Sequence, residues 1–332
     1  MKRALQAVVL AVFAAQTLVI GQGEEVKRVL SQIRTALGGE DKLVAVKSIA
    51  VEGQSMRPAP DGSTMAQDFE LAFELPANAV KFMKKDVVMN LGNATISRRS
   101  GFSGTDLIDE TDMPASMGDG VRVTRMGPGG PLPANATPEQ VAARKTQQLQ
   151  ANRREFARLA IGMLGTTTAA YPAEFVYAGQ VDSADGKADV LEVKAADGFA
   201  AKLYVDGKSH LPMMLVWMDK EPLRVMMGGN GGTVMSGGGG GGVVRSFSTT
   251  GDGQMQDPAK MQAEMDARLK EAEAARKTVE YRLFYAEYKM VDGVRMPTRI
   301  QRMVDGLPTE EMSLEKIKIN TKIDPAKFAI AK

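Results

Sequence analysis

Apolar and polar residues alternate along much of this chain with the period of two that is typical of half-buried β-strands. The clearest case is residues 281–319, where Asp292-Gly293 and Asp305-Gly306 separate three strand-like segments. Asp-Gly between alternating segments is a strong hairpin signal. In the middle segment one parity is apolar, with Val294, Met296, Ile300 and Val304, whereas the other carries Arg295, Arg299 and Gln301. We therefore expect a three-stranded antiparallel meander with one buried face.

Strand signals also occur upstream of the meander. The sequence contains eight Asp-Gly dipeptides, and strands do not alternate with helices, so consecutive hairpins are favoured over parallel crossovers. Residues 212–218 are apolar on both parities, which predicts a central strand covered on both faces. The other expected strands are 48–53, 68–75, 79–83, 94–100, 102–108, 173–177, 190–194 and 201–205.

Two amphipathic helices are predicted, with a short turn at 41–46 after the first. The first spans 24–37 and stops at Gly38-Gly39. The second begins at Pro138 with Thr137 as its cap and ends near Leu164-Gly165. Its polar side includes Arg144, Lys145, Arg153, Arg154 and Arg158. Because a helix with such an apolar stripe needs a partner, we expect it to lie on the concave side of the sheet.

Three segments have biased composition. Residues 109–137 are rich in Gly, Pro, Asp and Met without periodicity and predict a long loop. The glycine tract Gly228–Gly242 predicts a flexible surface loop, and Pro258–Lys277 predicts a charged, solvated helix. Both the tract and the charged helix are interpreted as insertions in one domain.

The N-terminus indicates export. Lys2 and Arg3 precede a mainly apolar stretch, Ala4–Ile20, and small residues follow it. This order predicts a signal peptide over residues 1–22 and a periplasmic or secreted protein, and an uncleaved membrane anchor is the alternative. The chain has no cysteine, so no disulfide stabilises it, and its net charge of +2 is dispersed, which argues against nucleic-acid binding.

Catalytic and metal-binding patterns are weak. His210 is the only histidine and lies in a turn context, and no Gly-x-Ser-x-Gly elbow accompanies it, so an exported hydrolase is the weakest hypothesis. The 22 methionines suit a copper(I) site less well than an adaptable apolar surface. We therefore expect no catalytic residue, metal or cofactor.

Short motifs spread over the chain resemble the lipoprotein-carrier (LolA/LolB-like) superfamily, in particular its uncharacterised exported bacterial relatives. The motifs are Ala36-Leu37-Gly38-Gly39 with Leu43, Val46 and Lys47, then Tyr204-Val205-Asp206 with Leu211-Pro212, residues 288–297, and Ile319-Asn320 with Ile323-Asp324 and Phe328. The resemblance implies a strongly curved antiparallel sheet, an incomplete barrel, whose apolar hollow is lidded by helices and accepts acyl chains.

The combined prediction is an α+β, β-rich protein with a single domain over 23–332. Its function is expected to be binding or carrying a hydrophobic ligand, a lipid or a lipoprotein acyl chain, with transient membrane contact and no enzymatic activity. An envelope structural or interaction protein with a filled, non-binding hollow is the alternative. The expected lining residues are Phe156, Leu159, Met163, Leu164, Met213, Leu215, Trp217 and Phe284.

Overall fold

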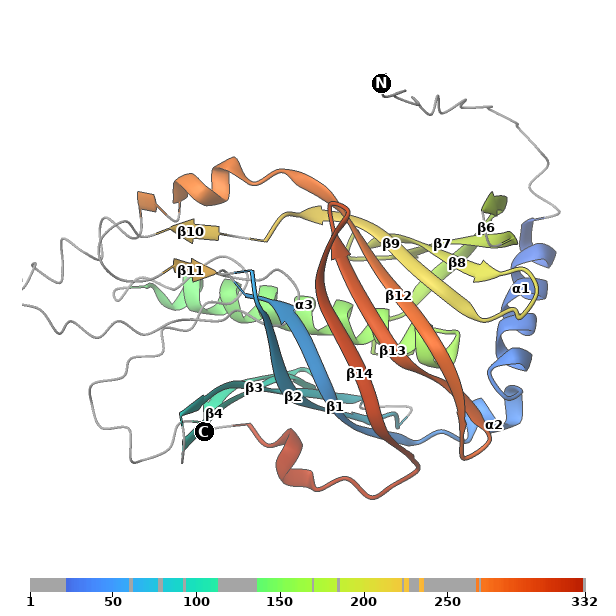
Figure 1. Cartoon of the computed structure of the whole chain (residues 1–332), viewed down its shortest axis with the longest axis horizontal. Coiled ribbons are helices and arrows are strands. Elements are labelled where there is room, and N and C mark those ends of the chain that lie inside the picture. Colours follow the sequence, from blue (N-terminus) through green and yellow to red (C-terminus); the bar gives the residue numbers. More distant parts are fainter. Residues whose placement is uncertain are drawn as a thin grey trace, which may run out of the picture.

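A computed structural model of the protein describes residues 22–59, 62–76, 80–91, 94–112, 136–168, 170–183, 186–222, 224–226, 233–235, 267–268 and 270–330. Almost all of the predicted signal segment, residues 1–21, lies outside these ranges. Within them the dominant element is one twelve-stranded antiparallel sheet that bends around a long helix (Figure 1).

The sheet is built from consecutive hairpins. Its strands run in the order β5-β4-β3-β2-β1-β14-β13-β12-β9-β8-β7-β6, so the C-terminal strand β14 pairs with the first strand, β1. Since β5 and β6 remain the two edges, the sheet is open, and the prediction of a curved, incompletely closed antiparallel sheet is confirmed. The strands of the first arm are β1 (Ser48–Pro58), β2 (Thr64–Glu74), β3 (Lys81–Leu91), β4 (Ala94–Ser103) and β5 (Asp106–Asp112). Those of the second arm are β6 (Ala173–Ser183), β7 (Gly186–Ala195), β8 (Ala200–Asp206) and β9 (Pro212–Lys220).

The predicted C-terminal meander joins the two arms. It consists of β12 (Thr278–Val291), β13 (Val294–Val304) and β14 (Leu307–Ile319). Both Asp-Gly turns have positive φ at both residues, 49° and 85° at Asp292 and Gly293, and 50° and 78° at Asp305 and Gly306. Such turns match the right-handed twist of the flanking strands. The expected parity is confirmed, because Val294, Met296, Ile300 and Val304 are all buried.

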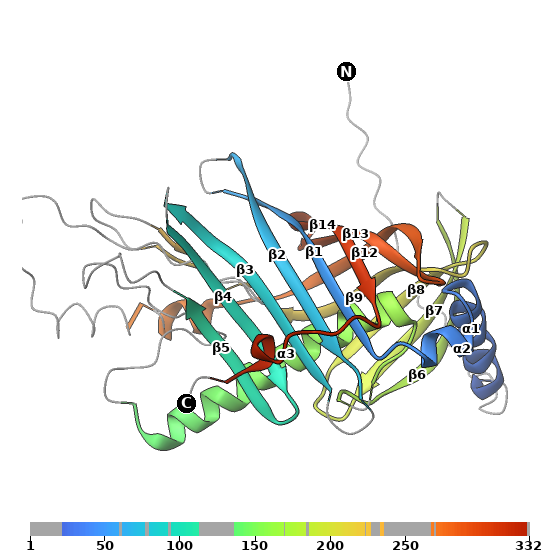
Figure 2. The same cartoon turned by 90° about the horizontal axis from the view of Figure 1, so that it is seen from below.

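The long helix α3 (Pro138–Leu164) lies between the two arms, and its first turns extend past the strands (Figure 2). The predicted start and end are confirmed. Thr137 and Gln140 form a reciprocal capping box, and Gly165 ends the helix in the left-handed conformation with φ 63°. No helix in the described part of the chain is long and apolar enough to cross a membrane.

Two shorter helices, α1 (Gln22–Ala36) and α2 (Glu40–Val44), lie at the end of the sheet where α3 stops (Figure 1). Val29 and Ile33 of α1 and Leu37, which directly follows it, are fully buried. The chain leaves α1 through Gly38 with φ 131°, where an added Cβ would lie 3.2 Å from the Cα of Val294. The 3-10 helix η2 (Pro325–Phe328) contacts β3, and its Phe328 belongs to a small second core with Ala72, Met83, Ile108 and Ile323.

Some predicted strands differ from the observed ones. Phe102 belongs to β4, because Phe102 pairs with Leu107 across a turn at 104–105, so the strand expected at 102–108 is split between β4 and β5. Residues 109–112 of the expected loop belong to β5, which continues to Asp112. Residues 113–135 lie outside the described ranges.

The prediction for β9 is also wrong in part. This strand is the fourth from the β6 edge and does not lie at the centre of the sheet. Leu215 and Trp217 are buried, but Met218 on the other parity is 58% exposed. Met214 and Val216 on that parity are half-buried, so the strand is fully covered on its concave side only.

The biased segments are described only in part. Within the glycine tract Thr233–Met235 forms strand β11, which pairs with β10 (Arg224–Met226), so this stretch of the expected loop is a strand. Residues 267–268 and 270–275 are helical, in agreement with the predicted charged helix, which ends before β12 begins at Thr278. The rest of both segments lies outside the described residues.

Candidate functional site: a trough filled by a helix

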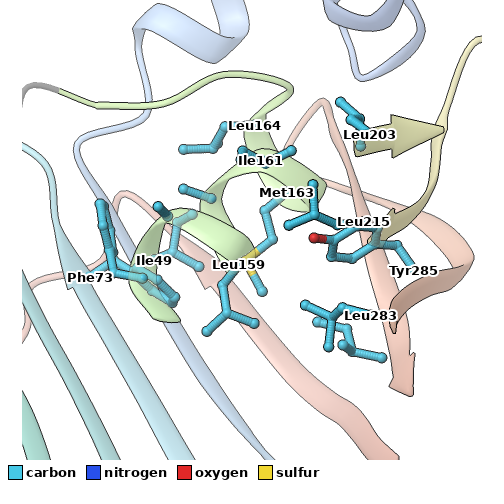
Figure 3. Close-up of a cluster of buried hydrophobic side chains, with 14 of the residues drawn as sticks. Ile49, Phe73, Leu159, Ile161, Met163, Leu164, Leu203, Leu215, Leu283 and Tyr285 are labelled. Carbon is cyan, nitrogen blue, oxygen red and sulfur yellow. The ribbon is translucent and has the colours of Figure 1, made fainter. Parts of the chain in front are cut away.

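The concave face of the sheet between the two arms, here called the trough, is occupied by the C-terminal half of α3. Figure 3 shows Leu159, Ile161 and Met163 of this helix between Ile49 and Phe73 on one side and Leu203, Leu215 and Tyr285 on the other. Every residue from Glu155 to Leu164 is buried, whereas most of the first half of the helix is exposed. The predicted concave partner of the helix is thus the observed one.

Six of the eight predicted lining residues belong to one core cluster at this interface, namely Phe156, Leu159, Met163, Leu164, Leu215 and Trp217. Phe284 is placed differently. Its neighbours Leu283 and Tyr285 are buried, so Phe284 lies on the opposite face of β12, beside Met214 of β9. Met213 is half-buried at an irregularity in the β8–β9 register. The structure therefore brings six of these residues together and leaves Phe284 outside.

Phe156 anchors the helix to the first arm. Its ring lies 5.8 Å from that of Phe73, 5.7 Å from that of Phe82 and 5.6 Å from that of Phe102, measured between centroids. All four rings are buried. Aromatic pairs at these separations add about 0.5–1.5 kcal/mol beyond their buried area.

Two tyrosines of β12, in the meander, bind the helix backbone. The Tyr285 hydroxyl donates to the carbonyl of Arg158 at 2.6 Å. The Tyr288 hydroxyl lies 2.9 Å from the carbonyl of Gly162 and 3.0 Å from that of Pro212, and can donate to one of them at a time. Burial raises the pKa of both tyrosines, so both remain protonated donors. The helix is therefore held by side chains that reach its own carbonyls.

Charged side chains interrupt the apolar trough where the helix becomes buried. We call this group the buried charge cluster; it is linked by ion pairs between α3, β1, β3, β13 and β14 and comprises Arg57, Lys84, Asp86, Glu155, Arg158, Arg302 and Glu310. Arg302 donates to Glu155 at 2.5 Å, and Arg158 donates to the same carboxylate at 3.3 Å. Lys84 lies 3.3 Å from Glu310, which Arg57 also contacts.

The electrostatics keep Glu155 and Glu310 ionised. Burial alone would raise the pKa of the Glu310 carboxyl, but Lys84, Arg57 and Arg302 outweigh it and hold that pKa well below its usual range. The pKa of Glu155 is lowered in the same way, since Arg302 and Arg158 outweigh the effect of burial. Buried ion pairs gain little net stability, because desolvation offsets most of their attraction.

Several donors in this region lack an acceptor within the described part of the protein. They are Nε of Arg158, Nη1 of Arg302 and the indole Nε1 of Trp217. Arg302 Nε lies 3.5 Å from Glu310, an ion-pair distance without a well-formed hydrogen bond. The Arg158 guanidinium lies 4.2 Å from the centroid of the Trp217 ring, which stacks on Tyr281 at 5.3 Å. A buried donor without an acceptor costs about 1–3 kcal/mol, so these groups are ready to bind an acceptor.

The sequence analysis missed the buried charge cluster. It placed Arg158 on the polar side of the long helix, yet Arg158 is only 5% exposed, because the arms of the sheet enclose that side as well. Arg302 shares its parity with Ile300 and Val304, and Lys84 shares its parity with Phe82. The sequence feature that could have revealed the cluster is a charged residue at an otherwise apolar alternating position of a strand. This feature recurs on several strands.

A second hollow, of about 620 Å³, lies on the convex side of the meander. Glu287, Arg299, Glu311 and Lys316 are among its lining residues. Arg299 contacts both Glu287 and Glu311. This charged, open hollow is unsuited to a hydrocarbon chain.

The single histidine, considered above for catalysis, has a structural role. His210 occupies the turn between β8 and β9 with φ 56°, and its amide donates to the carbonyl of Asp206 at 2.9 Å. Among the described residues no group of three or more His, Cys, Asp or Glu side chains is placed to hold a metal ion.

Neither a protein-family model nor a curated protein matches this chain. Among solved structures, a DUF1329 family protein from Desulfovibrio piger is 9% identical, with a TM-score of 0.42 over 92% of this chain and 97% of that one. A LolA superfamily protein from Nitrosomonas europaea is 11% identical, with a TM-score of 0.42 over 92% and 97%. A domain assigned to outer membrane lipoprotein-sorting proteins, from Vibrio parahaemolyticus, is 11% identical, with a TM-score of 0.43 over 92% and 96%.

Proposed function

We propose that this protein is an exported binding or carrier protein of the bacterial envelope for a ligand with a hydrocarbon chain, such as a lipid or a lipoprotein acyl chain. The observation that carries the proposal is that one helix fills an otherwise empty apolar trough. If α3 were withdrawn, the inward faces of both arms would be exposed together. Apolar surface of this kind gains about 25 cal/mol per Å² when a hydrocarbon covers it.

We expect the ligand to displace α3 from the trough. Its first half is mostly exposed, so the helix can be drawn out without unfolding the sheet. The interface also includes the buried charge cluster, whose ion pairs contribute little net stability. Of the lining residues inferred from the sequence, Leu215 and Trp217 of β9 would contact the chain of the ligand, whereas Phe156, Leu159, Met163 and Leu164 leave with the helix.

The basic and apolar N-terminal pattern, Lys2 to Ile20, supports export to the periplasm, where such ligands must cross water. Contact with a membrane would be transient, at loading and release. No catalytic role is proposed.

The close packing of α3 favours a second candidate. A Cβ added at Gly162 would lie 2.6 Å from Cζ of Tyr285, so helix and sheet touch without a gap at this point. In that case the hollow is permanently filled, and the protein is a structural or interaction partner in the envelope.

Binding and helix movement can be measured together. The purified mature chain is extracted with organic solvent for lipid analysis by mass spectrometry, and amide hydrogen exchange is then followed with and without a fluorescent fatty acid. We expect a bound lipid, and faster exchange in residues 155–164 when the fatty acid binds, because the helix leaves the trough. If no lipid is extracted, no fatty acid binds and the amides of residues 155–164 stay protected, the second candidate, a structural protein with a permanently filled hollow, would be favoured instead.

A further inference from the structure

We infer that the ligand of the trough is an anionic amphiphile, and that Glu155 of α3 occupies the position of its head group in the closed state. The inference rests on the proposed function and specifies the chemistry of the ligand. It is argued from the charges that remain on the sheet when the helix is removed.

Glu155 is a carboxylate presented by the helix to cations of the sheet. Its Oε1 accepts from Arg302 of β13 at 2.5 Å, and the charge of Lys84 of β3 also lowers its pKa. Directly after it come the apolar residues Phe156, Leu159 and Met163, all fully buried. The helix therefore brings an anion followed by hydrocarbon into the trough, which is the pattern of a fatty acid or an anionic lipid.

Withdrawal of α3 removes both Glu155 and Arg158 from the buried charge cluster. Three cations, Arg57, Lys84 and Arg302, then remain on the sheet with two carboxylates, Asp86 and Glu310. Both carboxylates are already shared between Arg57 and Lys84. Because the two helix charges cancel, the cluster keeps the excess of one positive charge that it has in the closed state, but Arg302 loses the closer of its two carboxylates.

With the helix withdrawn, Arg302 would keep only Glu310, at 3.5 Å from its Nε. Its Nη2 loses Glu155, and its Nη1 has no acceptor in the described structure even with the helix in place. The indole Nε1 of Trp217, also buried on the concave side, is a further donor without an acceptor there. Two nitrogens of one guanidinium fork suit a carboxylate or a phosphate, which accept two parallel hydrogen bonds.

Asp219 is a further acid at the edge of the cluster, 4.0 Å from Arg158, but its side chain is 48% exposed and its ion pair is with this helix residue. It is therefore solvated when the helix leaves and does not neutralise Arg302. An oxyanion head group would take the place of Glu155 as the acceptor of Arg302.

The first test compares head groups on one chain length with the unmodified protein. Oleate, its methyl ester and oleyl alcohol are titrated, and oleoyl lysophosphatidylglycerol is compared with monooleoylglycerol, which lacks the phosphate. We expect oleate to bind at least about tenfold more tightly than its ester, since a charged hydrogen-bonded pair is lost in the ester. For each anionic lipid the affinity is divided by that of its uncharged counterpart. The larger of the two ratios identifies carboxylate or phosphate as the natural head group.

Two variants test the roles of the residues. Arg302→Gln should abolish the preference for the acid over the ester, whereas Arg299→Gln, on the convex side of the same strand, should keep it. Glu155→Gln removes the internal competitor and should raise the affinity for oleate, and Glu139→Gln, at the exposed start of the same helix, should not. Far-UV circular dichroism checks that each variant is folded.

The outcomes separate this inference from the proposed function. Equal affinity for oleate, its ester and the alcohol would leave a hydrocarbon carrier but overturn the anionic head group. Absence of binding by every amphiphile, also to the Glu155→Gln variant, would overturn both. Because the head-group comparison uses the unmodified protein, it remains decisive if a variant does not fold.

Discussion

Gly162 of α3 lies flat against the ring of Tyr285 of β12, and a side chain of even one carbon at this position would come within 2.6 Å of Cζ of that ring. The hydroxyl of the same tyrosine donates to the carbonyl of Arg158, one turn earlier in the helix. The contact fixes both the distance and the rotation of the helix above β12. The identity of residue 162 thus decides how deeply α3 enters the trough.

Gly162→Ala is expected to destabilise the protein by about 1–3 kcal/mol, because the added methyl group forces the ring or the helix to move. Urea unfolding followed by circular dichroism measures the loss. Gly23→Ala in α1 is the matched control, since nothing lies within 4 Å of an added Cβ there, and it should be neutral or slightly stabilising. An unchanged midpoint for Gly162→Ala would show that the helix does not press on Tyr285.

Arg302→Met should cost about 3–5 kcal/mol of unfolding free energy, because it leaves Glu155 and Glu310 buried with one cation fewer. Arg299→Met on the convex side should cost less than about 1 kcal/mol, since exposed ion pairs contribute little. Equal losses for the two variants would contradict the arrangement of the buried charge cluster.

Stability should fall in acid through this cluster. The folded-state pKa values of Glu155 and Glu310 are lowered from 4.5, so their contribution is fully present above about pH 4.5 and is lost as pH falls through the folded-state values. Urea unfolding at pH 7, 5, 4 and 3 should therefore show little change down to pH 5 and a decline below it. Glu310→Gln should flatten the decline more than Glu315→Gln, an exposed position on the same strand. A decline that is identical in both variants would assign acid sensitivity to other groups.

Trp217 should report the movement of α3. It is the only tryptophan, it stacks on Tyr281, and the Arg158 guanidinium lies 4.2 Å from its ring centroid. When a ligand displaces the helix, the cation leaves the ring, so the emission of Trp217 should change with ligand concentration. Arg158→Lys should alter the emission of the empty protein, whereas Arg154→Lys, whose partner is Asp197, should not. If the emission of Trp217 does not change while a ligand is shown to bind by another method, α3 stays in place.

Much of the fold could be predicted because local patterns specify it. The turns at Asp292-Gly293 and Asp305-Gly306, the cap at Thr137 and the stop at Gly165 lie where the sequence indicates them. The apolar stripe of the helix and its concave partner were predicted as well. The side of the sheet on which Phe284 lies was not predicted. Its neighbour strand β9 is apolar at both alternating positions, so it does not indicate which side of β12 is buried.

The sequence by itself determined the antiparallel hairpins, the long helix and the apolar character of their contact, since each depends on residues a few positions apart. Only the tertiary structure decided that β1 pairs with β14, and that Glu155 meets Arg302 across 147 positions of sequence. Arg302, a charged residue at an apolar alternating position, has no ion-pair partner in its own strand. Its partner therefore depends on how strands distant in the sequence align. The head-group chemistry inferred for the trough comes entirely from that alignment.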